Sequence, residues 1–537
     1  MIEAQDVVIT GGGLAGLSFA LQLKQRCPDA SICILERNVP PWPVATHKVG
    51  ESTVEIGAHY FSRTLGLSQH LDDCHLRKFG FRFFHSHGRE DIDAVQEIGV
   101  SRYLSAPSYQ IDRGILENHL LERVREAGVS YVSGARVDAV KLATDATEER
   151  GHRVLFRRDR TLEELRARWV VDASGRAGLL KRQLGLAEPN GHDANSVWFR
   201  VPIRLDIEDW SRDPGWLNRC QPGHRWRSTN HLVGEGYWVW LIPLSSGYHS
   251  VGIVADAARH PFATMNSFDR AMDWLGGHQP RLARALRDSG AAPADFVKLR
   301  GFSYDCREVF SNGRWAITGE AGVFLDPFYS PGSDFIAIAN TFITDLVARD
   351  LGGMTWKPYL GVYGQLFRSF YDSTLLLYRG QYPLFGDPEV LPVKIIWDYA
   401  YYWGILCQLF FQERLTDISM LGRTREPLQA ARALNETVQP LFRAWSRVSR
   451  RENPARLLDQ AELGWFAELN HSLRDCLDED GFVARIGESL DRLRELAAEI
   501  VAAIATAYPQ ARGWPELAVV EALAPPRIRA GPGLLDY

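Results

Sequence analysis

The stretch Asp6-Val7-Val8-Ile9-Thr10-Gly11-Gly12-Gly13-Leu14-Ala15-Gly16 decides the fold of this 537-residue chain. A short apolar run leads into glycines spaced G-x-G-x-x-G, and an apolar helical pattern follows them. A second apolar run, 32–35, ends at Glu36. This order predicts a strand, a tight turn, a helix and a second strand, and it is typical of a Rossmann-like dinucleotide-binding unit.

Each glycine of the pattern has a physical role. Gly11 forms the tight turn, Gly13 allows a pyrophosphate to approach the backbone, and Gly16 lets the helix pack closely on the strand. The pyrophosphate then faces the positive end of the helix, beside Leu14. Glu36 lies twenty residues after Gly16, where its carboxylate can accept hydrogen bonds from ribose hydroxyls.

The bulk composition is that of an ordinary globular protein, with 45% hydrophobic and 24% charged residues. The formal net charge of -5 gives no reason to expect a nucleic-acid partner. Seven dispersed cysteines without C-x-x-C favour reduced thiols and a cytoplasmic location, and we expect no metal site. No signal peptide is expected before the first strand, and the apolar stretch 395–411 is too short and too polar to span a membrane.

Two later segments also predict a ligand-binding edge. Residues 169–171 form an apolar run that ends in Asp172-Ala173-Ser174-Gly175-Arg176. A second run, 315–318, ends in Gly319-Glu320-Ala321-Gly322, and a proline-glycine loop then precedes a long apolar helix from about residue 335. Because ligands of open α/β sheets bind at the carboxyl ends of the strands, we expect both segments near the cofactor.

The remaining chain predicts a second layer and a helical end. Residues from about 195 to 255 alternate apolar and polar side chains, which predicts a mostly antiparallel sheet, and 76–84 alternates as one further strand. From about residue 356 onward only helix signals are found. We therefore expect an α/β fold with a Rossmann-like dinucleotide-binding domain, an antiparallel substrate-side sheet and a C-terminal helical region. The expected boundaries are a core over 1–350 (cofactor-binding parts about 1–70, 105–185 and 300–350; sheet layer about 76–104 and 190–300) and helices over 351–537.

Together, the glycine turn, the Asp172 segment and the Glu320 segment resemble the FAD-binding elements of the p-hydroxybenzoate-hydroxylase-like flavoprotein superfamily. The resemblance covers about residues 1–350 and implies one bound FAD, with Glu320 in the place of the usual aspartate that bonds the ribityl chain. It implies cofactor contacts from Gly11, Gly13, Leu14, Ala15, Gly16, Glu36, Arg37, Gly50, Ser52, Arg113, Asp172, Gly319, Glu320, Pro327 and Gly332.

Two further motifs narrow the resemblance. Residues 238–243 read W-x-W-x-I-P, which looks like the signature of flavin-dependent halogenases, and Lys78 in K-x-G-x-x-F resembles their active-site lysine. The resemblance implies that reduced FAD and oxygen convert chloride or bromide to hypohalous acid, which Lys78 holds by a hydrogen bond or as a haloamine. Trp238 and Trp240 then keep the organic substrate off the flavin, and a separate NAD(P)H-dependent flavin reductase supplies FADH2.

The late loop departs from the family's pattern. Tyr329 stands before Ser330 where tryptophan halogenases carry glutamate, so the chain looks more like the branch acting on phenols or pyrroles, free or bound to a carrier protein. We expect Ser330 at the catalytic site and Phe328 with Tyr329 at the substrate pocket. Halide in this family is bound partly by backbone N–H groups after that serine; Pro331 has none, which leaves Gly332 and Ser333 as donors.

Alternatives remain open at this point. Without the halide chemistry, the chain is a flavin-dependent aromatic monooxygenase or oxidase on a halogenase-like fold, or a silent flavin-binding subunit. A lone lysine in a strand is usually a solvated charge, and tryptophans at alternate strand positions usually pack one sheet face. The aromatic cluster 397–403 is either a packed helix seam or a wall for an aromatic substrate.

Overall fold

A computed structural model of the protein describes residues 4–44, 48–143 and 151–524. The chain forms two compact units, and each unit is assembled from three separate segments. Unit 1 contains residues 1–75, 111–191 and 303–371. Unit 2 contains residues 76–110, 192–302 and 372–537.

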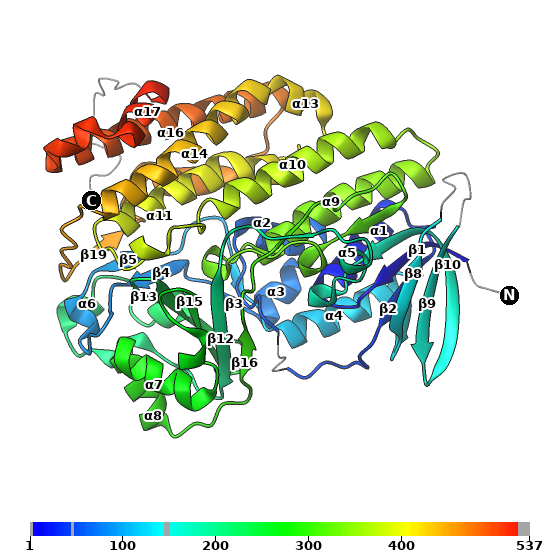
Figure 1. Ribbon diagram of the computed structural model, residues 1–537, viewed down its shortest axis with the longest axis horizontal. Coiled ribbons are helices and arrows are strands. Elements are labelled where there is room, and N and C mark those ends of the chain that lie inside the picture. The colour runs from blue at the N-terminus through cyan, green and yellow to red at the C-terminus, as the bar shows by residue number, and fades with distance from the viewer. Residues whose placement is uncertain (1–3, 45–47, 144–150, 525–537) are drawn as a thin grey trace. The chain divides into compact units, whose positions relative to one another are not determined.

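Unit 1 holds the parallel sheet that the glycine pattern predicts, and Figure 1 shows its strands side by side. Its elements are β1 (Ala4–Thr10), α1 (Leu14–Arg26), β2 (Ile32–Glu36), α2 (Glu55–His59), α3 (Ser68–Cys74), α4 (Arg113–Glu126), β7 (Ser130–Ser133), β8 (Arg136–Lys141), β9 (His152–Arg158), β10 (Thr161–Asp172), α5 (Leu179–Gln183), β11 (Ala187–Glu188), β17 (Asp305–Cys306), β18 (Trp315–Ile317), α9 (Gly332–Leu351) and most of α10 (Lys357–Leu375).

The main sheet of unit 1 has the order β7-β2-β1-β10-β9-β8, and β18 pairs with the carboxyl end of β10. Strands β7, β2, β1, β10 and β18 are parallel, whereas β9 and β8 extend the sheet in antiparallel fashion. In this register Thr10 lies opposite both Leu35 and Asp172. The chain therefore leaves β1, β2, β10 and β18 at the same sheet edge.

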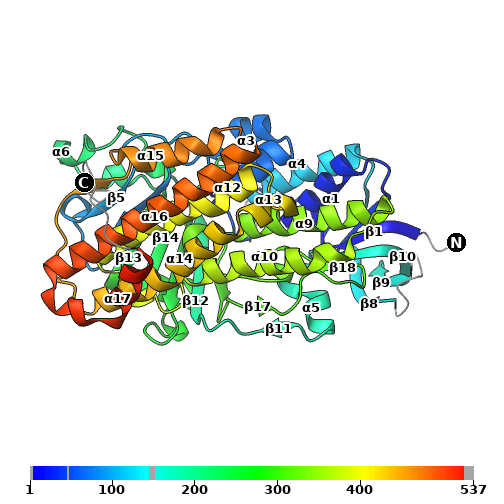
Figure 2. The same ribbon diagram turned by 90° about the horizontal axis from the view of Figure 1, so that it is seen from above.

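Unit 2 contains an eight-stranded sheet and the C-terminal helices, among which α14 and α16 run side by side (Figures 1 and 2). Its elements are β3 (Leu76–Arg77), β4 (Phe81–Phe84), β5 (Glu97–Gly99), β6 (Tyr109–Gln110), β12 (Ala194–Val201), α6 (Pro214–Leu217), β13 (Thr229–Gly234), β14 (Tyr237–Pro243), β15 (His249–Asp256), α7 (Phe268–His278), α8 (Pro280–Ser289), β16 (Val297–Leu299), α11 (Val390–Tyr401), α12 (Gln408–Phe411), α13 (Ile418–Arg423), α14 (Arg425–Ser446), β19 (Leu457–Asp459), α15 (Gly464–His471), α16 (Glu479–Ala507) and α17 (Pro515–Leu523).

The sheet of unit 2 has the order β16-β12-β15-β14-β13-β4-β5-β19. Five of its eight strands, β16, β12, β15, β14 and β13, pair in antiparallel fashion, as the alternation of residues 195–255 predicts. Alternate side chains of β12, β14 and β15, including Val239 and Leu241, join a buried core with residues of α7 and α8. The predicted α/β class is therefore confirmed.

Two expectations about unit 2 are wrong. Residues 76–84 do not form one strand: β3 pairs with β6 in a small separate sheet, β4 belongs to the large sheet, and Lys78 lies between them. Gly80 has φ +67°, a left-handed conformation that interrupts a strand and that glycine adopts without steric cost. The C-terminal region also contains a strand, because β19 pairs in parallel with β5.

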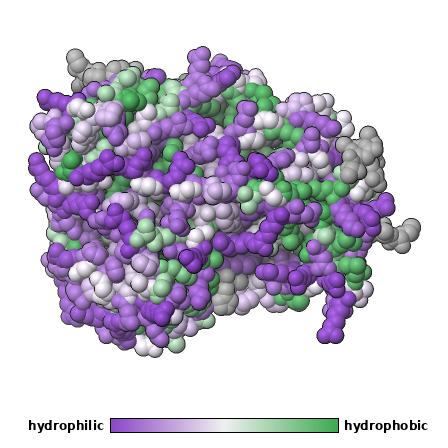
Figure 3. All heavy atoms as spheres, in the orientation of Figure 1, coloured by the Kyte–Doolittle hydropathy of each residue, from purple (hydrophilic) through white to green (hydrophobic). Residues whose placement is uncertain are grey.

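Hydrophilic side chains are spread across the face of the molecule drawn in Figure 3, with hydrophobic ones between them. Among the described residues, no helix combines the length and the apolar character needed to cross a bilayer.

Asp350 near the end of α9 joins three parts of unit 1. It accepts hydrogen bonds from Arg168 Nε (2.8 Å), Arg314 Nε (2.9 Å) and Trp169 Nε1 (2.8 Å). Its burial alone would raise its pKa, but these bonds outweigh the burial and lower the pKa to about 2. The ionised carboxylate thus ties α9 to β10 and to the start of β18.

We expect Asp350→Asn to destabilise the protein by about 2 kcal/mol at pH 7, since a pKa lowered from 3.8 to about 2 has that free-energy equivalent. The native state favours the charged form, so this stabilisation is complete above pH 5 and is lost as the pH falls through 4 toward 2. Urea unfolding at several pH values measures the gap between wild type and variant. Asp138→Asn, which removes a solvent-exposed ion pair with Arg157, is the control and should change stability by less than about 1 kcal/mol. A gap at pH 7 no larger than that of the control would contradict the assignment.

Candidate functional site

The glycine turn of unit 1 combines two crowded positions with one open position. Gly11 has φ +111°, and a Cβ there would lie 2.3 Å from the carbonyl oxygen of Ala173. A Cβ on Gly16 would lie 2.0 Å from the carbonyl oxygen of Gly11, so the helix packs directly on the turn. A Cβ on Gly13 would meet only Lys48 Nζ, at 4.0 Å. Gly13 therefore presents its backbone to open space at the start of α1, as a pyrophosphate site requires.

Glu36 ends β2 beside this turn and is buried. Its Oε2 accepts a hydrogen bond from the backbone N–H of Gly12 (2.7 Å), and Oε1 accepts two from Asn38 (both 2.8 Å). A carboxylate has about four acceptor positions, so Oε2 retains capacity for a ribose hydroxyl. Arg37, the next residue, is exposed.

The segment 319–322, which contains Glu320, lies against the glycine turn within unit 1. Gly319 has φ +60°, and a Cβ there would lie 3.0 Å from the Ala15 side chain. Gly11 in turn abuts Ala173, so three segments far apart in the sequence share one sheet edge. Pro327 begins the short helical turn 327–329, which Asp326 caps by accepting from the N–H of Phe328 (3.0 Å).

Ser330 follows that turn in the left-handed conformation, with φ +53°. Non-glycine residues rarely adopt this conformation, and such strain is concentrated at functional sites. Pro331 is the N-cap of α9, so Gly332 and Ser333 supply its first backbone N–H groups. Phe328 is buried and Tyr329 is half-buried, with their rings 4.8 Å apart.

Asp172, expected at the cofactor, uses both carboxylate oxygens within the protein. Oδ1 accepts from the N–H of Ser174 (3.0 Å) and from the Thr10 hydroxyl (3.2 Å), and Oδ2 accepts from the N–H of Leu180 (2.7 Å). Burial raises its pKa, and these hydrogen bonds oppose the rise. Asp172 thus shapes the turn that carries Arg176.

Four cations surround Glu320 in unit 1. Burial raises the pKa of Glu320, and the charges of four basic side chains oppose that rise. These side chains are Arg176, Arg113, Lys181 and Lys48. A cluster in which cations outnumber the carboxylates they face suits an anionic ligand.

Glu117, which the sequence analysis missed, holds two of these cations. Its buried carboxylate forms an ion pair with Lys48 and accepts from Arg113 Nη2 (2.6 Å). Arg113 Nη1 also donates to the carbonyl of Val49 (2.5 Å), and a Cβ on Gly50 would lie 3.0 Å from the same nitrogen. Ser52, two residues after Gly50, is buried. The spacing of Arg113 and Glu117 on one helix was a usable sequence signal.

Arg176 and Lys181 flank the ring of Tyr304, which carried no sequence signal. Lys181 Nζ lies 3.7 Å from the ring centroid and donates to the carbonyl of Gly322 (2.8 Å). Burial lowers the pKa of Lys181 to about 8. Arg176 lies 5.5 Å from the same ring, and its buried Nη1 has no hydrogen-bond partner. An unpaired buried guanidinium nitrogen, together with the open backbone at Gly13, fits an anionic dinucleotide such as FAD.

Lys78 in unit 2 is not a solvated surface charge, because only 4% of the residue is exposed. Its Nζ lies 3.3 Å from the centroid of the Phe81 ring. This distance lies within the range of a cation–π interaction. Its backbone N–H donates to the carbonyl of Ser108 (2.8 Å).

A row of aromatic rings connects Lys78 with the two predicted tryptophans. From Phe81 the ring centroids are 5.3 Å to His231, and from His231 they are 5.1 Å to Trp238. Trp238 and Trp240 lie 5.6 Å apart on one face of β14. The structure thus connects Lys78 with Trp238 and Trp240 by way of Phe81 and His231, and the place of His231 was not predicted.

Both tryptophans are buried and well packed. Trp238 Nε1 donates to the hydroxyl of Tyr382 (3.1 Å), and Trp240 Nε1 donates to that of Ser250 (3.1 Å). A Cβ on Gly252 would lie 2.2 Å from the Trp240 ring, so the indole rests on the neighbouring strand. They form one packed sheet face, and that face is continuous with the rings beside Lys78.

Comparisons with known proteins give one matching family model and several relatives that are similar over most of this chain. A sequence model of the family described as "Lycopene cyclase protein" matches residues 6–194. The flavin-dependent halogenase chlA of Dictyostelium discoideum is 26% identical over 76% of this chain and 70% of its own length. The 1H-pyrrole-2-carbonyl-[peptidyl-carrier protein] brominase of Pseudoalteromonas luteoviolacea (strain 2ta16) is 23% identical over 71% and 87%.

The chain is similar in sequence to flavin-dependent halogenases. The fold agrees: the crystal structure of halogenase PltM matches 92% of this chain and 96% of its own, with a TM-score of 0.64 and 18% identity. The predicted resemblance is therefore confirmed. The lycopene cyclase match ends before residue 238, so it contains the glycine turn and Asp172 but not the W-x-W-x-I-P segment.

We expect Gly13→Val to weaken FAD binding at least tenfold without lowering the thermal midpoint of the apoprotein. The valine side chain enters space open in the protein, and the φ of −88° at Gly13 suits any residue. Titration with FAD followed by flavin fluorescence measures the affinity. Gly16→Ala is the contrast, because its Cβ collides with the carbonyl of Gly11, and it should lower the midpoint itself. Full FAD affinity in Gly13→Val would refute the assigned position of the cofactor.

Proposed function

We propose that this protein is an FADH2-dependent halogenase that installs chloride or bromide on an electron-rich aromatic ring, a phenol or a pyrrole. The observation that carries the proposal is the buried Lys78 ammonium on the Phe81 ring, continuous with Trp238 and Trp240. The halogenase names of the relatives support halogenation as the reaction. FAD, when bound and reduced, would supply the two electrons that reduce oxygen to the peroxide level, at which it can oxidise the halide.

Residues of unit 1 are proposed to hold the cofactor. Gly13 and the start of α1 receive the pyrophosphate, and Glu36 Oε2 accepts from a ribose hydroxyl. Glu320 accepts from the ribityl chain; burial raises the pKa of its carboxyl, and the charges of the nearby basic side chains oppose that rise. Arg176 Nη1 donates to an anionic part of the same ligand.

Halide is proposed to bind at the start of α9. Gly332 and Ser333 supply N–H groups at the positive end of a twenty-residue helix, and the left-handed Ser330 turns the loop toward them. Pro331 contributes no donor, so this site has one fewer backbone N–H than a loop without proline. We infer weak halide binding and a rate that rises with bromide or chloride into the millimolar range.

Lys78 is proposed to present hypohalous acid to the substrate. Its ammonium donates a hydrogen bond to the oxygen of the acid, which makes the halogen more electrophilic. A carbon of the aromatic ring attacks the halogen, the O–halogen bond breaks, and the released hydroxide leaves as water with the proton from that ring carbon. An activated phenol or pyrrole reacts without a further carboxylate, in keeping with Tyr329 at the position before Ser330.

The C-terminal helices are proposed to contribute to substrate selection through Tyr399. Its ring lies 6.3 Å from Phe81, the ring on which Lys78 rests, and 4.5 Å from Trp403. Trp397 instead donates to Asn435 within the helices (2.9 Å) and belongs to their packed seam. The cluster 397–403 thus contains Trp397, which belongs to a packed helix seam, and Tyr399, whose ring lies near the Phe81 ring beside Lys78.

Two partners follow from the proposal. A separate NAD(P)H-dependent flavin reductase supplies FADH2. The aromatic substrate is a free small molecule or one bound to a carrier protein, and the carrier-protein substrate in the name of the pyrrole brominase supports the second form.

We expect Lys78→Met to abolish halogenation, at least a hundredfold, while FAD stays bound and FADH2 is reoxidised at the wild-type rate. Methionine keeps an unbranched chain on Phe81 and removes the ammonium. The assay supplies FADH2, oxygen and bromide with a panel of phenols and pyrroles, free and carrier-bound, and detects bromine isotope patterns by mass spectrometry. Lys298→Met, at an exposed lysine of β16, is the matched control and should keep full activity.

The outcome separates the proposal from its alternative. Retention of halogenation by Lys78→Met would eliminate the role of the lysine. Hydroxylated or dehydrogenated products that form without halide would instead identify a flavin-dependent monooxygenase or oxidase on this fold.

A further inference from the structure

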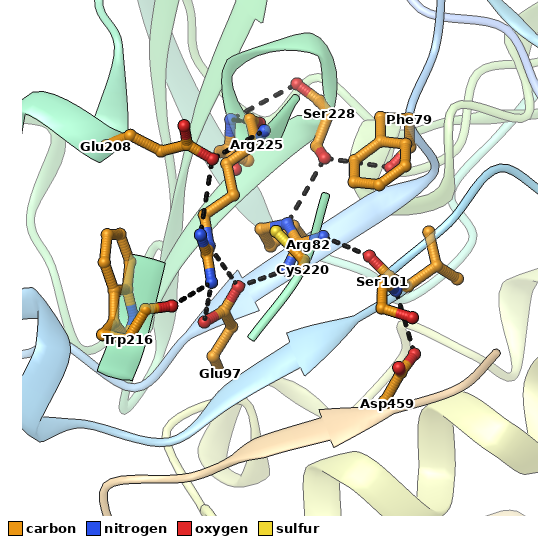
Figure 4. Close-up of polar contacts among 12 residues, drawn as sticks. Phe79, Arg82, Glu97, Ser101, Glu208, Trp216, Cys220, Arg225, Ser228 and Asp459 are labelled. Atoms are coloured by element: carbon orange, nitrogen blue, oxygen red, sulfur yellow. Dashed lines mark hydrogen bonds and ion pairs between the residues drawn. The ribbon is translucent and has the colours of Figure 1, made fainter. Parts of the chain in front are cut away.

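The connection that carries Lys78 is tied to a buried group of ionised side chains in unit 2 (Figure 4). Glu97 of β5 lies between Arg82 of β4 and Arg225, and the side chains of all three are 0% exposed. Arg82 Nη1 forms an ion pair with Glu97 Oε1, and Arg225 Nε donates to the same oxygen (2.9 Å). One carboxylate therefore joins two guanidinium groups in the interior.

The charged side chains of this group are paired with other groups in the interior. Arg225 also contacts Glu208 Oε1 (3.3 Å), donates to the carbonyl of Trp216 (2.8 Å) and lies 4.0 Å from the Trp216 ring. Two arginines thus face two carboxylates. Because an unpaired buried charge is costly, loss of Glu97 would oblige Arg82 to move.

A chain of hydrogen bonds leads from Arg82 to the residue next to Lys78, as Figure 4 shows. Arg82 Nε donates to the hydroxyl of Ser228 (3.4 Å), and that hydroxyl donates to the carbonyl of Phe79 (2.9 Å). The guanidinium also lies 5.5 Å from the Phe79 ring. On the far side of Phe79, the carbonyl of Gly80 accepts from the N–H of Thr229 (3.1 Å).

Buried ion pairs are common without any role in a reaction, and unit 2 contains another in Arg200 and Asp295. That pair lies on β12 and the loop after α8, where Asp295 accepts from both the backbone N–H (2.8 Å) and the guanidinium of Arg200. The Glu97 group differs because its chain of hydrogen bonds ends at the carbonyl of Phe79, the residue that follows Lys78. We propose that Glu97, through Arg82 and Ser228, is a positioning residue that determines where the Lys78 ammonium lies on the Phe81 ring.

This inference rests on the proposed function, so its test has two readouts. The first is halogenated product formed per FADH2 oxidised. The second needs no flavin: hypochlorous acid is added directly, and mass spectrometry follows N-chlorination of Lys78, in which an amine N–H is replaced by N–Cl and water is released. The variants are Glu97→Gln, which removes the charge, and Ser228→Ala, which removes only the hydroxyl link to Phe79.

We expect both variants to lower product per FADH2 and the rate of Lys78 N-chlorination at least fivefold, with FADH2 reoxidation unchanged. Asp295→Asn, which disrupts the other buried pair, should leave both readouts at wild-type values. If Glu97→Gln does not fold, Ser228→Ala alone decides, since it leaves every charge in place.

Wild-type values of both readouts in folded Ser228→Ala would overturn the proposal, and so would an equal loss in Asp295→Asn. If the wild-type protein halogenates nothing, the proposed function fails, yet the N-chlorination rates still decide whether the network positions the lysine.

Discussion

The parallel pairing of β1 with β2 on one side and β10 on the other is the constraint on which unit 1 depends. Parallel strands deliver their carboxyl ends to the same edge, so the residues after Thr10, Leu35 and Asp172 meet whatever their distance in sequence. Pairing of β18 with β10 adds the Glu320 segment to that edge. The candidate cofactor site is therefore a consequence of strand order, and its glycines are the positions where other backbone or ligand must approach.

Unit 2 buries a basic side chain, that of Lys78, among aromatic rings. The register of β4, β13 and β14 puts Phe83, His231 and Trp240 opposite one another, and the rings around them form a continuous row. Lys78 lies where the chain changes from one sheet to another, with its ammonium on Phe81. Because this connection lies outside both strands, contacts from other segments hold its backbone. Ser108, Ser228 and Thr229 provide those contacts.

Much of this arrangement was predictable. The strand–turn–helix unit, the acid after β2, the antiparallel run of unit 2 and the two motifs of the halogenase resemblance all follow from local patterns. The errors have local causes too. Alternation over 76–84 suggested a single strand, because side-chain periodicity carries no information on the left-handed Gly80 that divides it. The strand β19 was missed because three residues without a turn signal leave no periodic trace.

What the sequence determined by itself is the identity of the residues that fold locally: the glycine turn with Glu36, the Arg113–Glu117 pair on one helix, and the spacing of Trp238 and Trp240 on one face. Only the tertiary structure decided which cations surround Glu320, that Tyr304 lies between Arg176 and Lys181, and that Glu97 joins Arg82 to Arg225. The physical reason is the distance along the chain over which each kind of interaction acts. Turn geometry and helical or strand periodicity act over a few residues, whereas ion pairs and ring contacts depend on strand order and register, which bring together side chains more than a hundred residues apart.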